Sequence, residues 1–177
     1  MTPRLALLGA CLLLPACAST MEGQHGAIAE LTPTDGNTVT GTVEFIQKGD
    51  LVLVEAKVSG LSPNSTHGFH IHETGDCSAP DASSAGGHFD PTASPHGGPA
   101  DEIRHGGDLG NLKANANGTA TSSVKVGGIT IDGGPDRILG RAVVIHAGAD
   151  DFKSQPAGNS GARVACGVIN PTPEHSS

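Results

Sequence analysis

Apolar and polar residues alternate along residues 39–46, which is the pattern of a β-strand with one buried face. Residues 51–59 continue this pattern after the turn-forming residues 48–50, and the two segments together predict an antiparallel hairpin. Further short apolar runs predict strands at about residues 67–72, 112–115, 119–126, 141–146 and 164–169. No helix longer than a turn or two is indicated, so around eight short strands are expected to form an all-β antiparallel barrel or sandwich.

Two long stretches, from residue 73 to about 110 and from 147 to about 162, interrupt this pattern. Neither has a sustained period of two or 3.6, and both are dominated by small, polar and turn-forming residues. A stretch this long within a compact domain is usually either functional or disordered. Because the first stretch contains three histidines and Cys77, we expect it to be held in place.

Composition narrows the kind of protein. The 177 residues suffice for one domain with its own core, and the lack of Trp and Tyr means that Val, Ile, Leu and Ala must build that core. The formal net charge is −8 and no basic cluster occurs, so a nucleic-acid partner is not expected.

The N-terminus has the features of an export signal. Arg4 precedes the apolar run 5–14, which is too short to span a bilayer as a helix. Residues 14–17 fit a lipoprotein box in which Cys17 is acylated and tethers the protein to a membrane, whereas residues 16–18 fit ordinary signal cleavage; we favour the first. Both alternatives place the protein in the periplasm or cell envelope.

The expected domain organisation follows from these features. It comprises a signal over residues 1–18, a short tether over 19–25, one barrel domain over 26–171 and a tail over 172–177.

Cysteine usage agrees with export. Cys11 leaves with the signal, and Cys17 is either lipidated or removed. Cys77 and Cys166 then remain, and an oxidising compartment favours a disulfide between them over two free buried thiols.

The strand at residues 68–73 carries the first sign of chemistry. Its side chains alternate between faces, so His70 and His72 point the same way while Phe69 and Ile71 point the other. Two adjacent imidazoles are half of a transition-metal site, although two histidines on a solvated strand face would give the same pattern.

Further candidate ligands lie in or beside the two irregular stretches: His88, His96, His105, Asp108 and His146. Imidazole suits copper and zinc, and a carboxylate is an acceptable zinc ligand. With the His-x-His pair there are seven candidates, which exceeds the need of one tetrahedral metal. Two metals that share one ligand would use them all.

With these candidate ligands, the sequence resembles the Cu/Zn superoxide dismutases, in particular the secreted bacterial kind. Six stretches, in the family's order over about residues 28–170, carry the resemblance: Gly-Phe-His-Ile-His-Glu (68–73), Gly-Gly-His-Phe-Asp-Pro (86–91), His-Gly-Gly-Pro (96–99), Arg-His-Gly-Gly-Asp-Leu-Gly-Asn (104–111), Val-Val-Ile-His-Ala-Gly-Ala-Asp-Asp (143–151) and Gly-Asn-Ser-Gly-Ala-Arg-Val-Ala-Cys-Gly-Val-Ile (158–169). The resemblance implies an eight-stranded antiparallel Greek-key β-barrel, a flattened, immunoglobulin-like sandwich, with two long functional loops.

The resemblance also implies two ligand sets. Copper would be bound by His70, His72, His88 and His146. Zinc would be bound by His88, His96, His105 and Asp108. The ring of His88 would be shared by the two metals.

Residues around the metals are implied by the same matches. Asp150 would link His70 to His96, and Arg163 would stand beside the copper. The disulfide pairing of Cys77 with Cys166 is implied as well.

The implied activity is the dismutation of superoxide to dioxygen and hydrogen peroxide, in which copper cycles between Cu(II) and Cu(I) while zinc is structural. His88 would release copper and take up a proton, and Arg163 would attract the superoxide anion. The alternatives are a non-catalytic extracytoplasmic copper- and zinc-binding protein on the same fold, and a zinc hydrolase. Members of the family differ in their subunit contacts, so the sequence leaves a monomer and a homodimer both open.

Overall fold

The computed structural model describes residues 26–173; the expected signal, its Cys17 and the tether lie outside these residues, as does most of the tail. Eight strands and one short 3-10 helix follow in the order β1 Gly26–Pro33, β2 Thr40–Lys48, β3 Leu51–Ser59, β4 Thr66–His72, η1 Ser83–Ala85, β5 Asp108–Lys113, β6 Ala120–Val126, β7 Ala142–His146 and β8 Arg163–Pro171.

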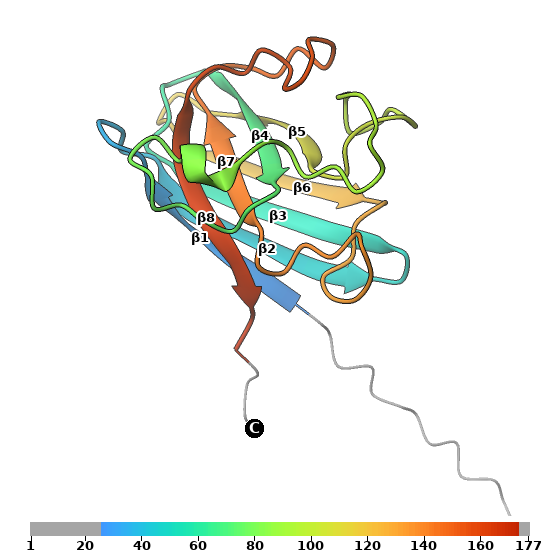
Figure 1. Ribbon diagram of the computed structural model, residues 1–177. Helices are drawn as coiled ribbons and strands as arrows, with labels where there is room; N and C mark the ends of the chain where they lie inside the picture. The colour runs from blue at the N-terminus through green and yellow to red at the C-terminus, as the bar shows by residue number, and fades with distance from the viewer. Residues whose placement is uncertain (1–25, 174–177) are drawn as a thin grey trace, which may run out of the picture.

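The strands form one antiparallel sheet in the order β5-β4-β7-β8-β1-β2-β3-β6 (Figure 1). The end strands β5 and β6 also contact each other, so the sheet is nearly closed into a barrel. The all-β antiparallel barrel expected from the sequence is therefore confirmed. β4 and β7, which are far apart in the chain, are direct neighbours, and this pairing matters for the site described below.

The strand pattern differs from expectation in two places. β1 was not marked by the alternation, because its inward positions are mainly the small residues Ala27 and Ala29. β5 begins at Asp108, four residues earlier than the apolar run suggested, where Gly110 weakens the periodic signal. The earlier start places Asp108 directly opposite His70 of β4.

Alternate residues of the strands fill the barrel, as the period of two requires. Val43 and Phe45 of β2, Val54 of β3 and Ile169 of β8 are fully buried. Large side chains such as Phe45 and Phe69 are few, and the rest of the core is aliphatic.

The two irregular stretches are ordered loops, of residues 73–107 between β4 and β5 and of residues 147–162 between β7 and β8 (Figure 1). We call them the first loop and the second loop. A disulfide joins Cys77 of the first loop to Cys166 of β8, with the two Cα atoms 5.8 Å apart, which confirms the expected pair. Around it, Ala82 and Ala85 pack against β7 in a small second core.

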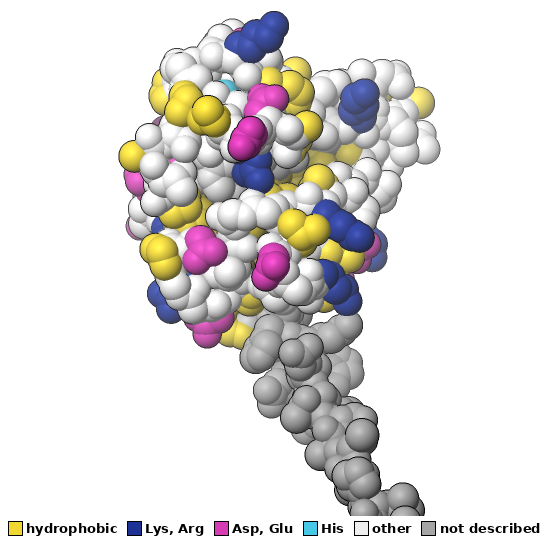
Figure 2. Space-filling model, turned by 90° about the vertical axis from the view of Figure 1, so that its right-hand side faces the viewer, with side chains coloured by type: hydrophobic (Ala, Val, Ile, Leu, Met, Phe, Trp, Pro, Cys, Tyr) yellow, Lys and Arg dark blue, Asp and Glu magenta, His cyan; other side chains and the backbone are white. Residues whose placement is uncertain are grey.

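The exposed surface is mixed in charge. On the face shown in Figure 2, acidic and basic side chains are scattered and almost no histidine is visible. Within residues 26–173, no helix has the length and apolar character needed to cross a membrane.

Candidate metal centre

Three histidines lie on two neighbouring strands. His70 and His72 point from β4, and His146 ends β7, which pairs with β4 so that His70 lies opposite Val144. We call His70, His72 and His146 the strand histidines. All three are buried, with exposed fractions of 0 to 4%.

Each of the strand histidines uses one ring nitrogen for a hydrogen bond outside the trio, and the other nitrogens of His72 and His146 face each other at 3.4 Å. His72 donates from Nδ1 to the Gly86 carbonyl at 2.9 Å, and His146 donates from Nδ1 to the Gly161 carbonyl at 3.1 Å. Nε2 of His70 lies 2.7 Å from Oδ2 of Asp150. These bonds select the tautomer of each ring and leave one lone pair per histidine for a metal.

Burial keeps these rings neutral. Desolvation lowers the pKa of His146 to about 4, and it lowers the pKa values of His70 and His72 well below their ordinary range. A metal-binding imidazole must be unprotonated, so the strand histidines are ready to bind a cation at neutral pH.

A second group lies where the first loop meets β5. We call His96, His105 and Asp108 the loop ligands; all are buried. Three Nδ1 atoms lie within 3.3 Å of a single oxygen, Oδ1 of Asp108: those of His88, His96 and His105. Three imidazoles and one carboxylate that converge in this way form the tetrahedral nitrogen and oxygen donor set of zinc.

The carboxylate of Asp108 is held in its charged form. Burial alone would raise the pKa of Asp108, but hydrogen bonds from His88 and from the Gly97 N–H outweigh it and bring the pKa well below its ordinary value. Its second oxygen accepts hydrogen bonds from the N–H groups of Gly97 and His105, at 3.1 and 2.9 Å. The same carboxylate therefore contacts the imidazoles and orders the loop that carries them.

One imidazole belongs to both groups. The strand histidines and His88 can each offer one ligand atom such that all four atoms lie within 4.8 Å of one another, and the same holds for His88 with the loop ligands. Nδ1 of His88 lies 2.9 Å from Oδ1 of Asp108. Its ring lies between the two groups, with its centroid 4.0 Å from that of His70.

Two buried nitrogens show that the donor set fits metal ions. Nδ1 of His70 and Nε2 of His88 are buried and have no hydrogen-bond partner among the described residues. A buried polar atom without a partner is costly, and a metal ion would satisfy both. Four imidazoles on one side suit copper, and three imidazoles with a carboxylate on the other suit zinc.

The Asp150 carboxylate contacts one histidine of each group. Its Oδ2 faces His70, and its Oδ1 lies 2.9 Å from Nε2 of His96. Asn111 holds the backbone of Asp150 with two hydrogen bonds of 2.8 and 2.9 Å. Gly158 lies against this arrangement, because a Cβ atom on it would be 1.8 Å from Oδ1 of Asp150.

Arg163 stands at the strand-histidine side, opposite His146 in the pairing of β7 and β8. Its guanidinium donates to the carbonyls of Ala82 and Gly86, and the Gly86 carbonyl also accepts the hydrogen bond from His72. Burial lowers the pKa of Arg163, but a guanidinium stays protonated at neutral pH. The charge is thus fixed next to the histidine cluster.

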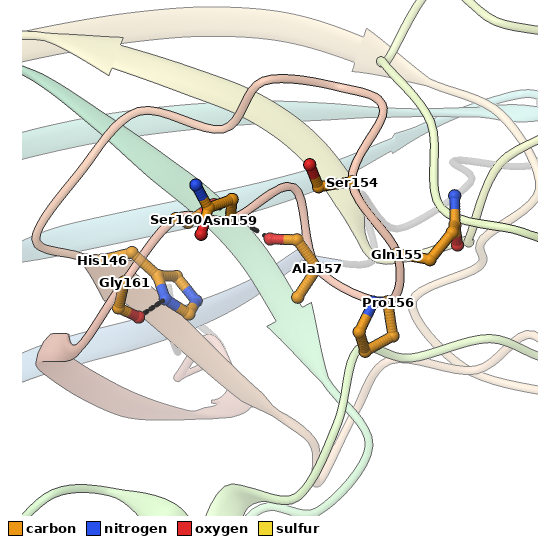
Figure 3. Close-up of a pocket in the computed structure, with 8 residues that line it drawn as sticks. All are labelled: His146, Ser154, Gln155, Pro156, Ala157, Asn159, Ser160 and Gly161. Carbon is orange, nitrogen blue, oxygen red and sulfur yellow. Dashed lines mark hydrogen bonds between the residues drawn. The ribbon is translucent and has the colours of Figure 1, made fainter.

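A cavity of about 290 Å³ opens beside His146 (Figure 3). Its other walls come from the second loop, including Asn159, Ser160 and Gly161. Of the strand histidines, only His146 lines this cavity.

The structure brings all seven candidate ligands together and places Asp150 and Arg163 against them. His67, which is out of phase with the His-x-His pair, lies in neither group; Nδ1 of His67 is 2.7 Å from the His146 carbonyl. Sequence analysis missed Asn111, Gln155 and Gly158, which hold Asp150 and His96 in place. No periodicity or metal-ligand spacing marks these three residues.

Comparisons with known proteins agree with this centre. Residues 39–169 match the family model described as copper/zinc superoxide dismutase. The chain is also 46% identical over 142 residues to a protein of Saccharomyces cerevisiae named superoxide dismutase [Cu-Zn], and the match covers 76% of this chain and 91% of the yeast protein. With so much of the domain matched, this chain belongs to the copper/zinc superoxide dismutase family.

Proposed function

We propose that the protein dismutes superoxide to dioxygen and hydrogen peroxide. The strand histidines and His88 would hold copper, and His88 and the loop ligands would hold zinc. The observation that carries the proposal is the ring of His88, which has one nitrogen among the loop ligands and an unpartnered, buried nitrogen on the side of the strand histidines.

Bound copper supplies one-electron chemistry by cycling between Cu(II) and Cu(I), whereas zinc has no accessible redox change and is structural. In the balanced reaction, two superoxide anions and two protons give one dioxygen and one hydrogen peroxide. His88 can hold one of these protons at Nε2, because that nitrogen has no other hydrogen-bond partner in the described part of the chain. Its Nδ1 stays with the loop ligands, so the ring keeps its orientation when the proton leaves.

Arg163 supplies the attraction for the substrate. A guanidinium fixed by two carbonyls can hydrogen-bond to a small anion and cannot be deprotonated at neutral pH. Electrostatic focusing within a cleft raises association rates by about 10- to 1000-fold and weakens with salt. Because the formal net charge of the protein is −8, an anion needs a local positive charge such as that of Arg163 to approach the site.

A measurement of metal content together with superoxide consumption tests the proposal. We expect one copper and one zinc per chain and activity that cyanide, a copper ligand, abolishes. Full activity in copper-free protein would contradict the proposal. Fully loaded protein without activity would favour the second candidate, a metal-binding protein without catalysis, against which the fixed position of Arg163 argues.

We further propose that the mature protein is exported to the periplasm or cell envelope and is tethered to a membrane through acylated Cys17. The support is the sequence order of Arg4, the apolar run 5–14 and the small residues before Cys17. Mass spectrometry of the mature N-terminus tests this: a diacylglyceryl cysteine at position 17 is expected, and an unmodified N-terminus after residue 18 would contradict it.

A further inference from the structure

His96 occupies a part of the first loop that has little structure of its own. Residues 93–98 form neither helix nor strand. The His96 N–H donates to Oε1 of Gln155 at 2.8 Å, and Nε2 of Gln155 donates to the His96 carbonyl at 2.9 Å. Within residues 26–173 these are the only hydrogen bonds of the His96 backbone.

We propose that Gln155 is a positioning residue for the metal ligand His96. The His96 ring is aligned by Asp108 and Asp150, and the Gln155 amide fixes the backbone from which that ring projects. Gln155 belongs to the second loop and His96 to the first, so this side chain joins the two loops beside the metal centre. The proposal rests on the zinc assignment made above.

The chemistry of the contact requires an amide. A carboxamide carries a donor and an acceptor side by side, so it can pair with both backbone groups of one residue as a neighbouring strand would. A carboxylate could accept from the N–H but would face the carbonyl with a second acceptor. A hydrocarbon of equal length would make neither bond.

Gln155 is itself held in place. Asp151 accepts hydrogen bonds from the N–H groups of Lys153 and Ser154 at 2.9 and 2.8 Å, and the Gly158 N–H donates to the Ser154 carbonyl at 2.7 Å. These bonds fold the second loop tightly on either side of Gln155. In Figure 3 the Gln155 side chain lies at the opposite end of the cavity from His146, and its hydrogen-bond partner is His96 of the loop ligands.

The experiment compares Gln155→Met with Gln47→Met in the full metal-loaded protein. Gln47 is a matched control, because its amide also makes hydrogen bonds to the backbone, with Gly49, Leu51 and Ile131, but away from the metal centre. Zinc release to a coloured chelator is followed in time. We expect zinc release to be about 10-fold faster in Gln155→Met. Loss of an outer hydrogen-bond partner usually lowers metal affinity by about 10- to 100-fold. We take the lower end because Gln155 is exposed to water.

Two further measurements separate positioning from loop stability. Cobalt(II) placed in the zinc site should show an altered visible spectrum in Gln155→Met and an unaltered one in Gln47→Met. The unfolding of the metal-free variants is measured alongside, and we expect little difference between Gln155→Met and the original protein.

Equal zinc release and an unchanged cobalt spectrum in Gln155→Met would overturn the inference, as would a loss of metal-free stability that accounts for the whole effect. Failure of the zinc assignment is a separate result. The original protein would then bind no zinc at the loop ligands, and its zinc content would show this before any variant is made.

Discussion

The strand histidines and the loop ligands meet at the same ring, that of His88, but they are held by different means. His70, His72 and His146 project from β4 and β7, whose ladder fixes their spacing. His96 and His105 lie in the first loop and depend on hydrogen bonds to side chains for their positions. A sheet can thus hold a metal site by pairing alone, whereas a loop needs a frame built around it.

We call Asp108, Asp150 and Gln155, the side chains that hold the first loop, the frame. Asp108 is its centre. The carboxylate of Asp108 contacts three imidazoles and two backbone N–H groups, and Asp150 and Gln155 add the outer contacts. The strand histidines have single outer hydrogen bonds, most of them to backbone carbonyls. Loss of Asp108 should therefore disturb the proposed zinc site and the local fold together, while changes to the strand histidines should mainly disturb metal binding.

The largest expected contrast is between Asp108→Ala and His146→Ala. Asp108→Ala removes a ligand and also leaves the N–H groups of Gly97 and His105 unpaired. We expect zinc affinity to fall by more than about 100-fold, beyond the usual effect of losing an outer partner. The metal-free protein should lose about 3 kcal/mol of stability, because each unpaired buried group costs about 1–3 kcal/mol.

His146→Ala should abolish copper binding yet leave zinc in place and the metal-free protein close to its original stability. Elemental analysis and urea unfolding of both metal-free variants check the pair. If His146→Ala destabilised the metal-free protein as much as Asp108→Ala, the distinction between ladder and frame would be wrong.

Acid should act on the strand histidines. Burial lowers the pKa of His146 from its ordinary value to about 4, so between about pH 6.5 and pH 4 the unfolded chain binds more protons than the folded one. The free energy of unfolding of the metal-free protein should therefore fall as the pH falls through this window, by about 3 kcal/mol from His146 alone. His70 and His72 act in the same direction.

Urea unfolding of the metal-free protein at several pH values measures this loss. In His146→Asn the slope between pH 6.5 and pH 4 should be smaller by one proton's contribution. An identical slope in the variant would show that His146 titrates normally in the folded protein.

A smaller effect is expected from Gly158→Ala, which alters the surroundings of Asp150 and His96 but replaces no ligand. The added methyl group would overlap Oδ1 of Asp150 and crowd Nε2 of His96, so the hydrogen bond between them must shift. We expect zinc affinity to fall by about 10- to 100-fold. Gly128→Ala is the control, since Gly128 has a similar positive φ of 76° but has no atom near the new methyl group. Equal losses in both variants would assign the effect to backbone strain.

The smallest expected effect is on substrate attraction. Arg163→Ala should keep both metals and lower the rate of superoxide consumption at low salt by about 10-fold, with a weaker dependence on salt. Arg137→Ala makes the same change in net charge at an exposed site, where Arg137 pairs with Asp132 at 3.7 Å, and should leave the rate nearly unchanged. Pulse radiolysis at two ionic strengths measures both, and equal rates for the two variants would remove the role given to Arg163.

The same contrast explains what could be predicted from the sequence. The alternation of residues 68–73 placed His70 and His72 on one face, and the apolar run before His146 indicated a strand. No alternation could reveal Gln155, because its partner His96 lies 59 residues away and neither belongs to a strand. The sequence pattern did not predict β1, because alanine at its inward positions gives little hydrophobic contrast.

The conformation of the first loop was harder to predict from the sequence than the strands were. Family motifs indicated which of its residues bind metals, but its conformation depends on long-range hydrogen bonds to Asp108, Asp150 and Gln155. The motifs marked Asp108 and Asp150, but no local pattern marked Gln155, which holds the backbone of His96.

The central claim, that one imidazole at position 88 joins the two metals, has a direct test. Cobalt(II) is placed at the loop ligands and copper(II) at the strand histidines, and the electron paramagnetic resonance of copper is recorded. If the His88 ring bridges the two ions, their unpaired spins couple through it and the copper signal is largely lost. A copper signal of full intensity, equal to that of the protein with zinc at the loop ligands, would contradict the account.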